Sequence, residues 1–570
     1  MAERDRGKAA RVRDLCRKLK PVIGEQADRI WMAYVVEDET GKSQLLDYLE
    51  ILSAKHFQDS LDQDGPGLVP PKAEAASGEF VLGKVAYNGQ ALFPFGLREN
   101  ELLSHVGIYG RSGAGKTTLG YLLVQQLVRA GKPVLILDWK RNYRDLVNLP
   151  GFEDMAIYTA GRSTAPFRFN PLIPPPGTTP QTWIKKIIAV LAHAYLLGDG
   201  VMFLMQEAID QVYSDAGVYG GTMKRWPTFR DVLDYLRNRK AMGREAGWMS
   251  SALRALSSLC FGEMDTLVNK GHDPVEDLLV RPVVLELDAL SQTDKTFITA
   301  GLILWIHHFR MAEPSREVLK GVVVIEEAHN ILSDQRSSLV GGQGVMELAF
   351  REAREYGLSL VCLDQMPSTI APSALANTYA VICFNLKHRS DMTAMSSAMM
   401  LDEDDKAVLG NLQVGEAIVR LQGRGTRPFM IHVPEFYIQK GAFTDTHVIH
   451  HMTRLGLLSA RNHEQQRPPR LESADQNKEK VRIGDFAVAE PIQMFIRDIA
   501  AFPEGGVAER YKRLGLSVRQ GQKTKELSAA SGLIQEQVLT TSRGKIRVIR
   551  LTEKGRMTLG TPERTPTEAG

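Results

Sequence analysis

The sequence predicts an α/β fold in which a mainly parallel sheet carries helices on its faces, together with a helical insertion, a helical N-terminal region and a small C-terminal domain. Three observations support this prediction. Short runs of β-forming residues alternate with segments long enough for a helix, several of these runs end in polar residues, and one of them opens into a glycine-rich loop. Alternation of strand and helix favours parallel strands joined by crossover helices.

Length and composition set the broad class of the protein. A chain of 570 residues exceeds what one hydrophobic core usually sustains, so two or three domains are expected. With 44% hydrophobic residues, 24% charged residues and a net charge of +3, the composition is that of a soluble protein. The four cysteines show no metal-binding spacing, and we find neither a signal peptide nor an apolar run of about 20 residues. We therefore expect a cytoplasmic protein without a membrane segment.

Composition also suggests the domain limits. Leucines at helical spacing mark an amphipathic N-terminal stretch, and two segments rich in proline or poor in apolar residues are typical of linkers. We expect a helical N-terminal region for interaction or oligomerisation (1–60), a linker (61–79), a main domain (80–458) with a helical insertion (about 181–270), a second linker (459–482), a small domain (483–560) and a tail (561–570).

The strands of the main domain are predicted from apolar, β-branched runs. They are 80–85, 106–109, 132–140, 283–288, 322–325, 359–365, 380–384 and 417–421, with a helix at 297–309. Ligands of such sheets bind at the carboxyl ends of the strands, which is where Asp138 falls.

The glycine-rich loop that follows the strand at 106–109 matches the phosphate-binding pattern G-x-x-x-x-G-K-[ST], and residues 119–129 predict the helix that leaves it. Backbone N–H groups of such a loop, and the positive end of the helix, attract phosphate oxygens. Lys116 would contact the β- and γ-phosphates and Thr117 would hold Mg²⁺. The alternative is a strand–helix turn that binds nothing. The predicted nucleotide-binding residues are Gly110, Arg111, Ser112, Gly113, Ala114, Gly115, Lys116, Thr117 and Thr118.

Two adjacent acidic residues, Glu326 and Glu327, end the strand at 322–325. Beside a phosphate-binding loop, the first carboxylate would support the metal and the second would orient or deprotonate the attacking water. The alternative is a pair of surface acids that favour a helix N-terminus.

A polar residue and two arginines complete the candidates. Gln365 ends the next strand, where its amide could contact a γ-phosphate or simply close the strand. Arg351 and Arg354 lie on a predicted helix at 345–356, where they could pair with neighbouring acids in solvent. An arginine can also stabilise the charge of phosphoryl transfer from a neighbouring subunit.

Taken together, these motifs resemble the HerA/FtsK family of ring-forming translocase ATPases over roughly residues 80–435. The resemblance is carried by residues 110–118, by the hhhhEEAHN pattern of 322–330, by 351–360, by Gln-Met-Pro-Ser at 365–368, by 377–378 and by 415–419. It implies a RecA-like P-loop NTPase core that uses ATP and Mg²⁺ and assembles as a homo-oligomer, a hexamer in most members.

The resemblance also assigns roles to individual residues. It implies Lys116, Glu327, Gln365 and Arg354 as catalytic residues, with Gln365 as sensor and Arg354 as an arginine finger acting on the neighbouring subunit, and Thr117 and Glu326 as metal ligands. Two positions depart from the family pattern: Glu326 stands where Asp is common, and Asp364 stands where Thr is common, which would add a carboxylate near the metal. The β-barrel that precedes the motor in typical members is not recognisable here.

The C-terminal domain is predicted from a helix–turn–helix followed by strands at 535–539 and 545–551, a pattern that resembles a winged helix. Residues 506–556 hold twelve Lys or Arg and four Asp or Glu, a net charge of +8. A net positive charge of this size indicates contact with a phosphate backbone. It favours binding to duplex DNA without sequence preference. The alternative is a winged helix used for protein contacts.

These observations predict an ATP-hydrolysing, ring-forming translocase or helicase that acts on double-stranded DNA, with a partner nuclease in DNA processing or anti-phage defence. A second reading is a regulatory or assembly ATPase ring that scaffolds a partner effector protein, because a helical N-terminus replaces the expected barrel. A third is a conjugation or secretion ATPase, against which the absence of a membrane segment counts.

Overall fold

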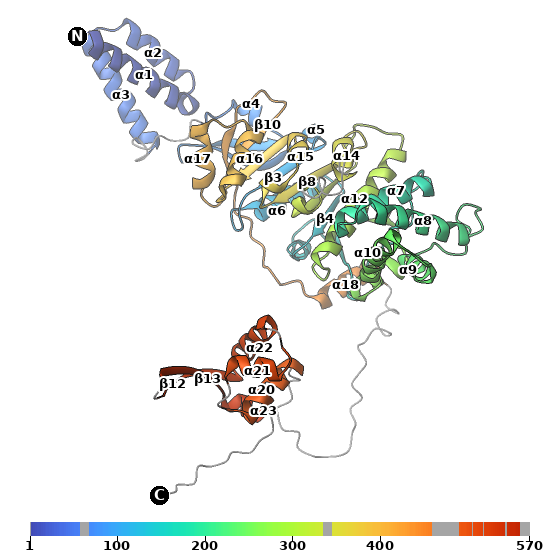
Figure 1. The fold of residues 1–570 in the computed structure, drawn as a ribbon. Helices are drawn as coiled ribbons and strands as arrows, with labels where there is room; N and C mark the ends of the chain where they lie inside the picture. The colour runs from blue at the N-terminus through green and yellow to red at the C-terminus, as the bar shows by residue number, and fades with distance from the viewer. Residues whose placement is uncertain are drawn as a thin grey trace. The chain divides into compact units, whose positions relative to one another are not determined.

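The structure is a computed structural model, and it describes residues 2–57, 68–333, 345–458, 490–503, 506–516, 518–541 and 544–558. The chain divides into two compact units, residues 1–467 and 468–570. Figure 1 shows the elements of both units, and each unit is described by itself.

An eleven-stranded sheet organises the first unit, with the strand order β2-β1-β11-β10-β9-β3-β8-β7-β4-β6-β5. The seven strands from β9 to β5 run parallel to their neighbours, whereas β10, β11, β1 and β2 continue the sheet in antiparallel pairs. This mainly parallel sheet confirms the predicted fold class. The strands are β1 (Phe80–Tyr87), β2 (Gln90–Leu97), β3 (Val106–Tyr109), β4 (Val134–Asp138), β5 (Ala156–Thr159), β6 (Val283–Glu286), β7 (Gly321–Glu326), β8 (Leu358–Asp364), β9 (Ala380–Phe384), β10 (Glu416–Leu421) and β11 (Phe429–His432).

Helices connect the strands of the sheet. The principal ones are α6, which leaves the phosphate-binding loop, and α12, which joins β6 to β7. The helices and 3₁₀ turns around the sheet are α4 (Ala73–Ala76), α5 (Glu99–Leu102), α6 (Lys116–Arg129), η1 (Arg144–Asn148), η2 (Val275–Leu279), α12 (Gln292–Ala312), η3 (Ala328–Asn330), α14 (Val345–Glu352), η4 (Pro367–Thr369), α15 (Pro372–Ala376), α16 (Arg389–Met399), α17 (Glu403–Asn411) and α18 (Asp445–Arg454).

The helical insertion predicted between the strands lies between β5 and β6. Its helices are α7 (Pro180–Tyr195), α8 (Asp199–Asp215), α9 (Phe229–Asn238), α10 (Arg244–Leu259) and α11 (Gly262–Asn269). Local signals start two of them: Thr179 caps α7 with Pro180 at its first position, and Thr228 with Asp231 forms a capping box on α9.

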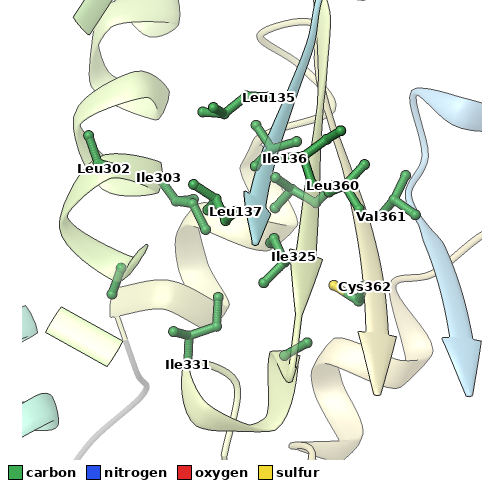
Figure 2. Close-up of a cluster of buried hydrophobic side chains, with 14 of the residues drawn as sticks. Leu135, Ile136, Leu137, Leu302, Ile303, Ile325, Ile331, Leu360, Val361 and Cys362 are labelled. Atoms are coloured by element: carbon green, nitrogen blue, oxygen red, sulfur yellow. The ribbon is translucent and has the colours of Figure 1, made fainter. Parts of the chain in front are cut away.

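The hydrophobic core lies between the parallel strands and the helices that cover them. Figure 2 shows Ile303 of α12 beside Leu137 of β4, within a buried cluster that includes Ile325 of β7 and Val361 of β8. These strands are buried along their whole length and mostly apolar, because both of their faces are covered. Polar groups therefore gather only where the strands end.

The N-terminal region is helical, as predicted. It consists of α1 (Ala2–Ile23), α2 (Gln26–Val36) and α3 (Glu39–Phe57), which pack around a small core that includes Val12, Ile30 and Leu49. Several apolar side chains of α2 and α3 remain exposed; they are Met32, Val35, Val36, Tyr48 and Ile51.

The described residues of the second unit form three helices, a two-stranded antiparallel hairpin and a final short helix. These are α20 (Glu490–Ala501), α21 (Val507–Arg513), α22 (Val518–Ala530), β12 (Ile534–Thr541), β13 (Gly544–Leu551) and α23 (Glu553–Thr558). The winged-helix assignment stays a prediction, and the predicted helix cap at Ser517 lies outside the described residues. Arg510 is fully buried against Asp498, so it is not part of a basic surface.

Three strands of the sheet were not predicted, namely β2, β5 and β11. Strand β2 contains Pro94, which weakens a strand prediction, but β2 lies at the edge of the sheet, where a missing N–H is tolerated. Strands β5 and β11 have four residues each, too short for a clear periodic signal.

The helix predicted over 345–356 is wrong at its C-terminal end. Helix α14 stops at Glu352, and residues 353–357 form turns before β8. Gly357 has φ 81°, and a Cβ there would lie 2.2 Å from the Val318 carbonyl oxygen, so the helix cannot continue through this glycine into β8. Arg354 therefore lies in a turn and not on the helix.

Candidate active site

Three neighbouring parallel strands bring the predicted site residues together at one edge of the sheet. The phosphate-binding loop follows β3, Gln365 follows β8, and Glu326 and Glu327 stand at the end of β7. The sheet order places β8 between β3 and β7, so Gln365 lies between the loop and the acidic pair. The loop is tied to this arrangement because Gly110 N–H donates to the Asp364 carbonyl at 3.2 Å.

The backbone of the loop requires its glycines. Gly113 and Gly115 have φ values of 75° and 123°, and a Cβ on Gly115 would lie 2.9 Å from the Phe384 ring. Arg111 is fastened to the end of β9, because its N–H donates to the Asn385 carbonyl at 2.8 Å and its Nε to Asn385 Oδ1 at 2.9 Å. The sequence thus folds into a rigid loop at the N-terminus of α6.

Lys116 lies at that helix N-terminus, and its ammonium turns back into the loop. Its Nζ donates to the carbonyl oxygens of Gly110 at 2.6 Å and Arg111 at 2.9 Å. Burial lowers the pKa of the Lys116 ammonium to about 8, against the opposing charges of Glu327 and Asp364. Thr117 and Thr118 follow in the first turn of α6.

Glu326 is nine-tenths buried and only partly satisfied. Asn142 Nδ2 donates to its Oε1 at 3.4 Å, whereas its Oε2 has no hydrogen-bond partner within the described part of the chain. Burial, followed by the charge of Asp138, raises the pKa of the Glu326 carboxyl to about 8. A buried carboxylate oxygen without a donor is suited to a cation, so the chemistry of Glu326 fits Mg²⁺, as does that of the Thr117 hydroxyl in the first turn of α6.

Glu327 is held by donors from two different strands. Its Oε1 accepts a hydrogen bond from Gln365 Nε2 at 2.8 Å and is also in contact with Lys140 Nζ. Its Oε2 lies 3.8 Å from His329 Nδ1. The residue has φ 53°, a left-handed conformation at the junction of β7 and η3 that is uncommon for a residue with a side chain.

Asp364 lies within this site, but its carboxylate is engaged by protein donors. Oδ2 accepts hydrogen bonds from the backbone N–H of His329 at 2.7 Å and from its ring at 2.9 Å, and Oδ1 accepts one from Met366 N–H at 2.7 Å. Glu327, His329 and Asp364 offer ligand atoms within 4.8 Å of one another. The hydrogen bonds between them account for this closeness, so Asp364 positions His329.

Arg354 is the one predicted catalytic residue that lies away from the others. It is exposed in the turn before β8, and it lines a cavity of about 540 Å³ with Ser104 and Tyr379, which precede β3 and β9. This cavity therefore lies at the amino ends of the strands. Strand β8 has seven residues, so about 23 Å of strand separates Arg354 from Gln365.

Lys140 and Asn142, which the sequence reasoning did not single out, contact both acids of the site. They lie on the loop after β4, two and four residues beyond Asp138, which was expected at a ligand-facing strand end. The signal that could have identified Lys140 and Asn142 is the run of polar residues that follows this strand. What the sequence could not show is that β4 lies directly beside β7.

Comparison with known proteins supports the resemblance in the main domain. Residues 80–175 match the family model described as the central domain of helicase HerA. The chain is 22% identical over 363 residues to the DNA double-strand break repair helicase HerA of Sulfolobus acidocaldarius, covering 57% of this chain. The match spans 63% of the length of that relative.

Two solved structures have a similar arrangement of the chain. VirB4 of Thermoanaerobacter pseudethanolicus aligns with a TM-score of 0.49 and 18% identity, covering 63% of this chain and 97% of that chain. The plasmid coupling protein TrwB in complex with the GTP analogue GDPNP aligns with a TM-score of 0.46 and 13% identity, covering 61% of this chain and 89% of that chain.

No helix among the described residues is long and apolar enough to cross a membrane. The family-model match begins at β1 and includes the whole phosphate-binding loop. The predicted resemblance is thereby confirmed: in its main domain the chain is similar to the HerA-type P-loop ATPases.

Proposed function

We propose that this chain is an ATP-hydrolysing motor that forms a ring and acts on double-stranded DNA. The observation that carries the proposal is the meeting of the phosphate-binding loop, the acidic pair and Gln365 at the ends of β3, β7 and β8. In this proposal the glycine-rich loop and Lys116 bind the phosphates of ATP.

Within one subunit, Glu327 acts as the general base and accepts the proton of the attacking water. Gln365 shares a hydrogen bond with Glu327, so it can transmit a change at the γ-phosphate to β8. Thr117 and Glu326 would hold Mg²⁺, which when bound offsets the charge of the phosphates. The orphaned oxygen of Glu326 supports this assignment.

The position of Arg354 supports the ring. Its turn lies at the amino ends of the strands, so it cannot reach the phosphates bound at the carboxyl ends of its own sheet. A head-to-tail ring pairs two different surfaces of the chain, so it can place the amino edge of one subunit's sheet against the carboxyl edge of the next. Arg354 would then stabilise the charge developing in its neighbour's site.

DNA as the substrate rests on two supports. The HerA relative is named for the repair of DNA double-strand breaks. The C-terminal residues 506–556 carry a net charge of +8, which favours binding to the phosphate backbone. A partner nuclease, in DNA processing or defence, belongs to this proposal as an expectation.

Hydrolysis is tested with the wild type, Glu327→Gln and Lys116→Ala, measured with and without duplex DNA. Glu327→Gln should bind ATP with unchanged affinity and lose turnover by about a hundredfold or more, because it removes the general base. Lys116→Ala should lose binding of the nucleotide itself. Wild-type turnover that ignores DNA, combined with no DNA affinity at low salt, would remove DNA from the proposal.

A second candidate is an ATPase ring that scaffolds a partner effector protein. The observation in its favour is the apolar surface of α2, where the exposed fraction is 71% for Met32 and 83% for Val36. Purification of the chain with and without residues 1–57 distinguishes the two readings. A stoichiometric partner that is lost with this segment favours the scaffold, and an unchanged isolated ring favours the motor.

A further inference from the structure

The carboxylate of Glu327 must point in one direction if it is to act as a base, yet its side chain has several rotatable bonds. In the structure both of its oxygens have neighbours that set this direction. Gln365 and Lys140 both contact Oε1, and His329 stands near Oε2. Only 16% of the Glu327 side chain is exposed, so solvent contributes little to its orientation.

Lys140 reaches Glu327 from a loop whose own backbone is fixed. Asp138 ends β4 and is fully buried, and its two oxygens accept hydrogen bonds from Lys140 N–H at 3.0 Å and Tyr143 N–H at 2.9 Å. These two bonds close the loop into a tight turn that holds the backbone of Lys140. The Lys140 side chain therefore extends toward Glu327 from a backbone whose position is fixed.

The same loop is fastened on its far side by ion pairs. Arg144, which is buried, donates to both oxygens of Glu286, at 2.6 and 2.5 Å, and to Asp445 at 2.8 Å. Arg141 donates to Asp445 at 2.6 Å. Because Glu286 ends β6 and Asp445 begins α18, the loop is braced against the neighbouring strand and against a helix.

Two side chains of this loop each contact one member of the acidic pair. Asn142 donates to Glu326, and Lys140 pairs with Glu327. The positive charge of Lys140 also lowers the pKa values of Lys116 and Glu326. The ammonium thus lies among the groups that surround the proposed position of the γ-phosphate.

Folding stability does not account for the Lys140–Glu327 pair. About half of the Lys140 side chain is exposed, and ion pairs of this kind contribute little to stability because solvent screens them. The geometry can instead orient the carboxylate. Two donors on Oε1 restrict its rotation and so fix the position of Oε2.

We propose that Lys140 is a positioning residue for ATP hydrolysis, which holds the Glu327 carboxylate, together with Gln365, in the orientation from which it accepts a proton. This inference rests on the proposed function of Glu327 as the base. It adds a residue from the loop after β4, a segment with no earlier part in the proposed reaction, and it makes the loop 138–143 the support of the acidic pair.

The test compares full-length Lys140→Met, Lys140→Arg and Glu327→Gln with the wild type. Lys140→Met keeps the length of the side chain but removes its charge and its donors, so kcat should fall about tenfold or more while KM changes less than about threefold, as expected for an interaction that orients the base rather than binds the substrate. Lys140→Arg should recover most of the turnover because it restores a donor. Lys140→Met should melt at the wild-type temperature and bind an ATP analogue normally.

Lys132→Met is the matched control. Lys132 forms a salt bridge of 2.6 Å with Glu99 at the opposite end of β4, so the substitution removes the same kind of contact from the same strand without touching the acidic pair. Its kcat should equal that of the wild type. A similar loss in Lys132→Met and Lys140→Met would overturn the positioning role.

The outcomes separate this inference from the proposed function. If Glu327→Gln is inactive while Lys140→Met turns over at the wild-type rate or faster, the role of Glu327 as the base is supported and the positioning role of Lys140 is overturned. If Glu327→Gln retains turnover, both are overturned. If the double variant Lys140→Met/Glu327→Gln loses no more turnover than Glu327→Gln alone, Lys140 acts through Glu327, and the inference is supported.

Discussion

His105 shows how two backbone partners determine the protonation state of a single side chain. It is fully buried just before β3, where Leu360 N–H donates to its Nδ1 at 3.1 Å, so its Nε2 must donate to the Phe350 carbonyl at 2.8 Å. A second proton on the ring, at Nδ1, would point at the N–H of Leu360, which is itself a donor. Burial lowers the pKa of His105 to about 4.

We expect His105 to make the first unit sensitive to acid. Between pH 6.5 and 4 the unfolded chain binds a proton at this position that the folded chain does not, so the free energy of unfolding falls as the pH falls. His105→Asn, which tolerates the left-handed backbone at this position (φ 68°), should weaken that dependence. Urea unfolding at several pH values measures it, with the exposed His450→Asn as control. Equal slopes for all three proteins would contradict the prediction.

Glu326 is the second residue whose burial has a measurable consequence. Its raised pKa means that folding disfavours the charged form, so stability decreases as the pH rises from 4.5 to about 8. Glu326→Gln keeps the shape and the contact with Asn142 but carries no charge. It should melt at the same or a higher temperature at pH 8 and require more Mg²⁺ for turnover. A lower melting temperature with an unchanged Mg²⁺ requirement would show that Glu326 acts in packing alone.

At the scale of elements, a buried ion pair fastens the antiparallel part of the sheet to α5. Arg424, between β10 and β11, donates to both oxygens of Glu101, and its other donors reach the carbonyl oxygens of Ala75, Ser77 and Gly96. Both side chains are at least 96% buried. The loop at 422–428 therefore depends on one guanidinium for its position.

Removal of this arginine should be costly because it leaves a buried carboxylate unpaired. We expect Arg424→Met to lower the free energy of unfolding by about 3–5 kcal/mol, measured by chemical denaturation. Arg316→Met, which removes an exposed arginine, should cost less than about 1 kcal/mol. If Arg424→Met/Glu101→Leu recovers none of the loss, the cost arises from packing and not from the unpaired charge.

At the scale of the whole molecule, the two edges of the sheet predict how activity depends on assembly. The phosphate-binding loop and Arg354 lie at opposite ends of the strands, so in the proposed ring Arg354 would complete the site of a neighbouring copy of the chain. Mixtures of inactive Arg354→Ala and inactive Lys116→Ala protomers should regain part of the ATPase activity. Arg351→Ala, a neighbouring arginine on α14, is the control and should not need rescue. An absence of rescue at every mixing ratio would argue for a cis role of Arg354.

The C-terminal unit provides a prediction about DNA that the structure makes sharper. Arg510 is buried, and both Arg510 and the exposed Arg513 are paired with Asp498, so the basic surface is smaller than the count of Lys and Arg suggests. Exposed cations remain at Lys512, Arg550 and Arg556. Reversing these three to Glu should weaken binding to duplex DNA and reduce its salt dependence, whereas reversing Lys18 and Arg29 in the N-terminal helices should have a smaller effect. Equal effects would remove the C-terminal unit from DNA contact.

Much of the site could be predicted because its signals are local. The glycines, Lys116 and Thr117 form one loop, and the residues before and after the loop predict its strand and helix. The acidic pair and Gln365 were predicted at strand ends for the same reason. The strand with Pro94 was not predicted, because only the sheet order shows that it lies at an edge, where a missing N–H is tolerated.

Local patterns in the sequence were enough to predict the P-loop fold class and the residues that meet at the ends of β3, β7 and β8, since hydrophobic pattern and turn chemistry act over a few neighbouring residues. Which strands lie side by side depends on the packing of the whole sheet. That order brings Lys140 to Glu327, 187 residues away in the chain, and buries one oxygen of Glu326 with no donor among the described residues. It also sends Arg354 to the far edge of the sheet, because the chain must run the whole length of β8 between Arg354 and Gln365.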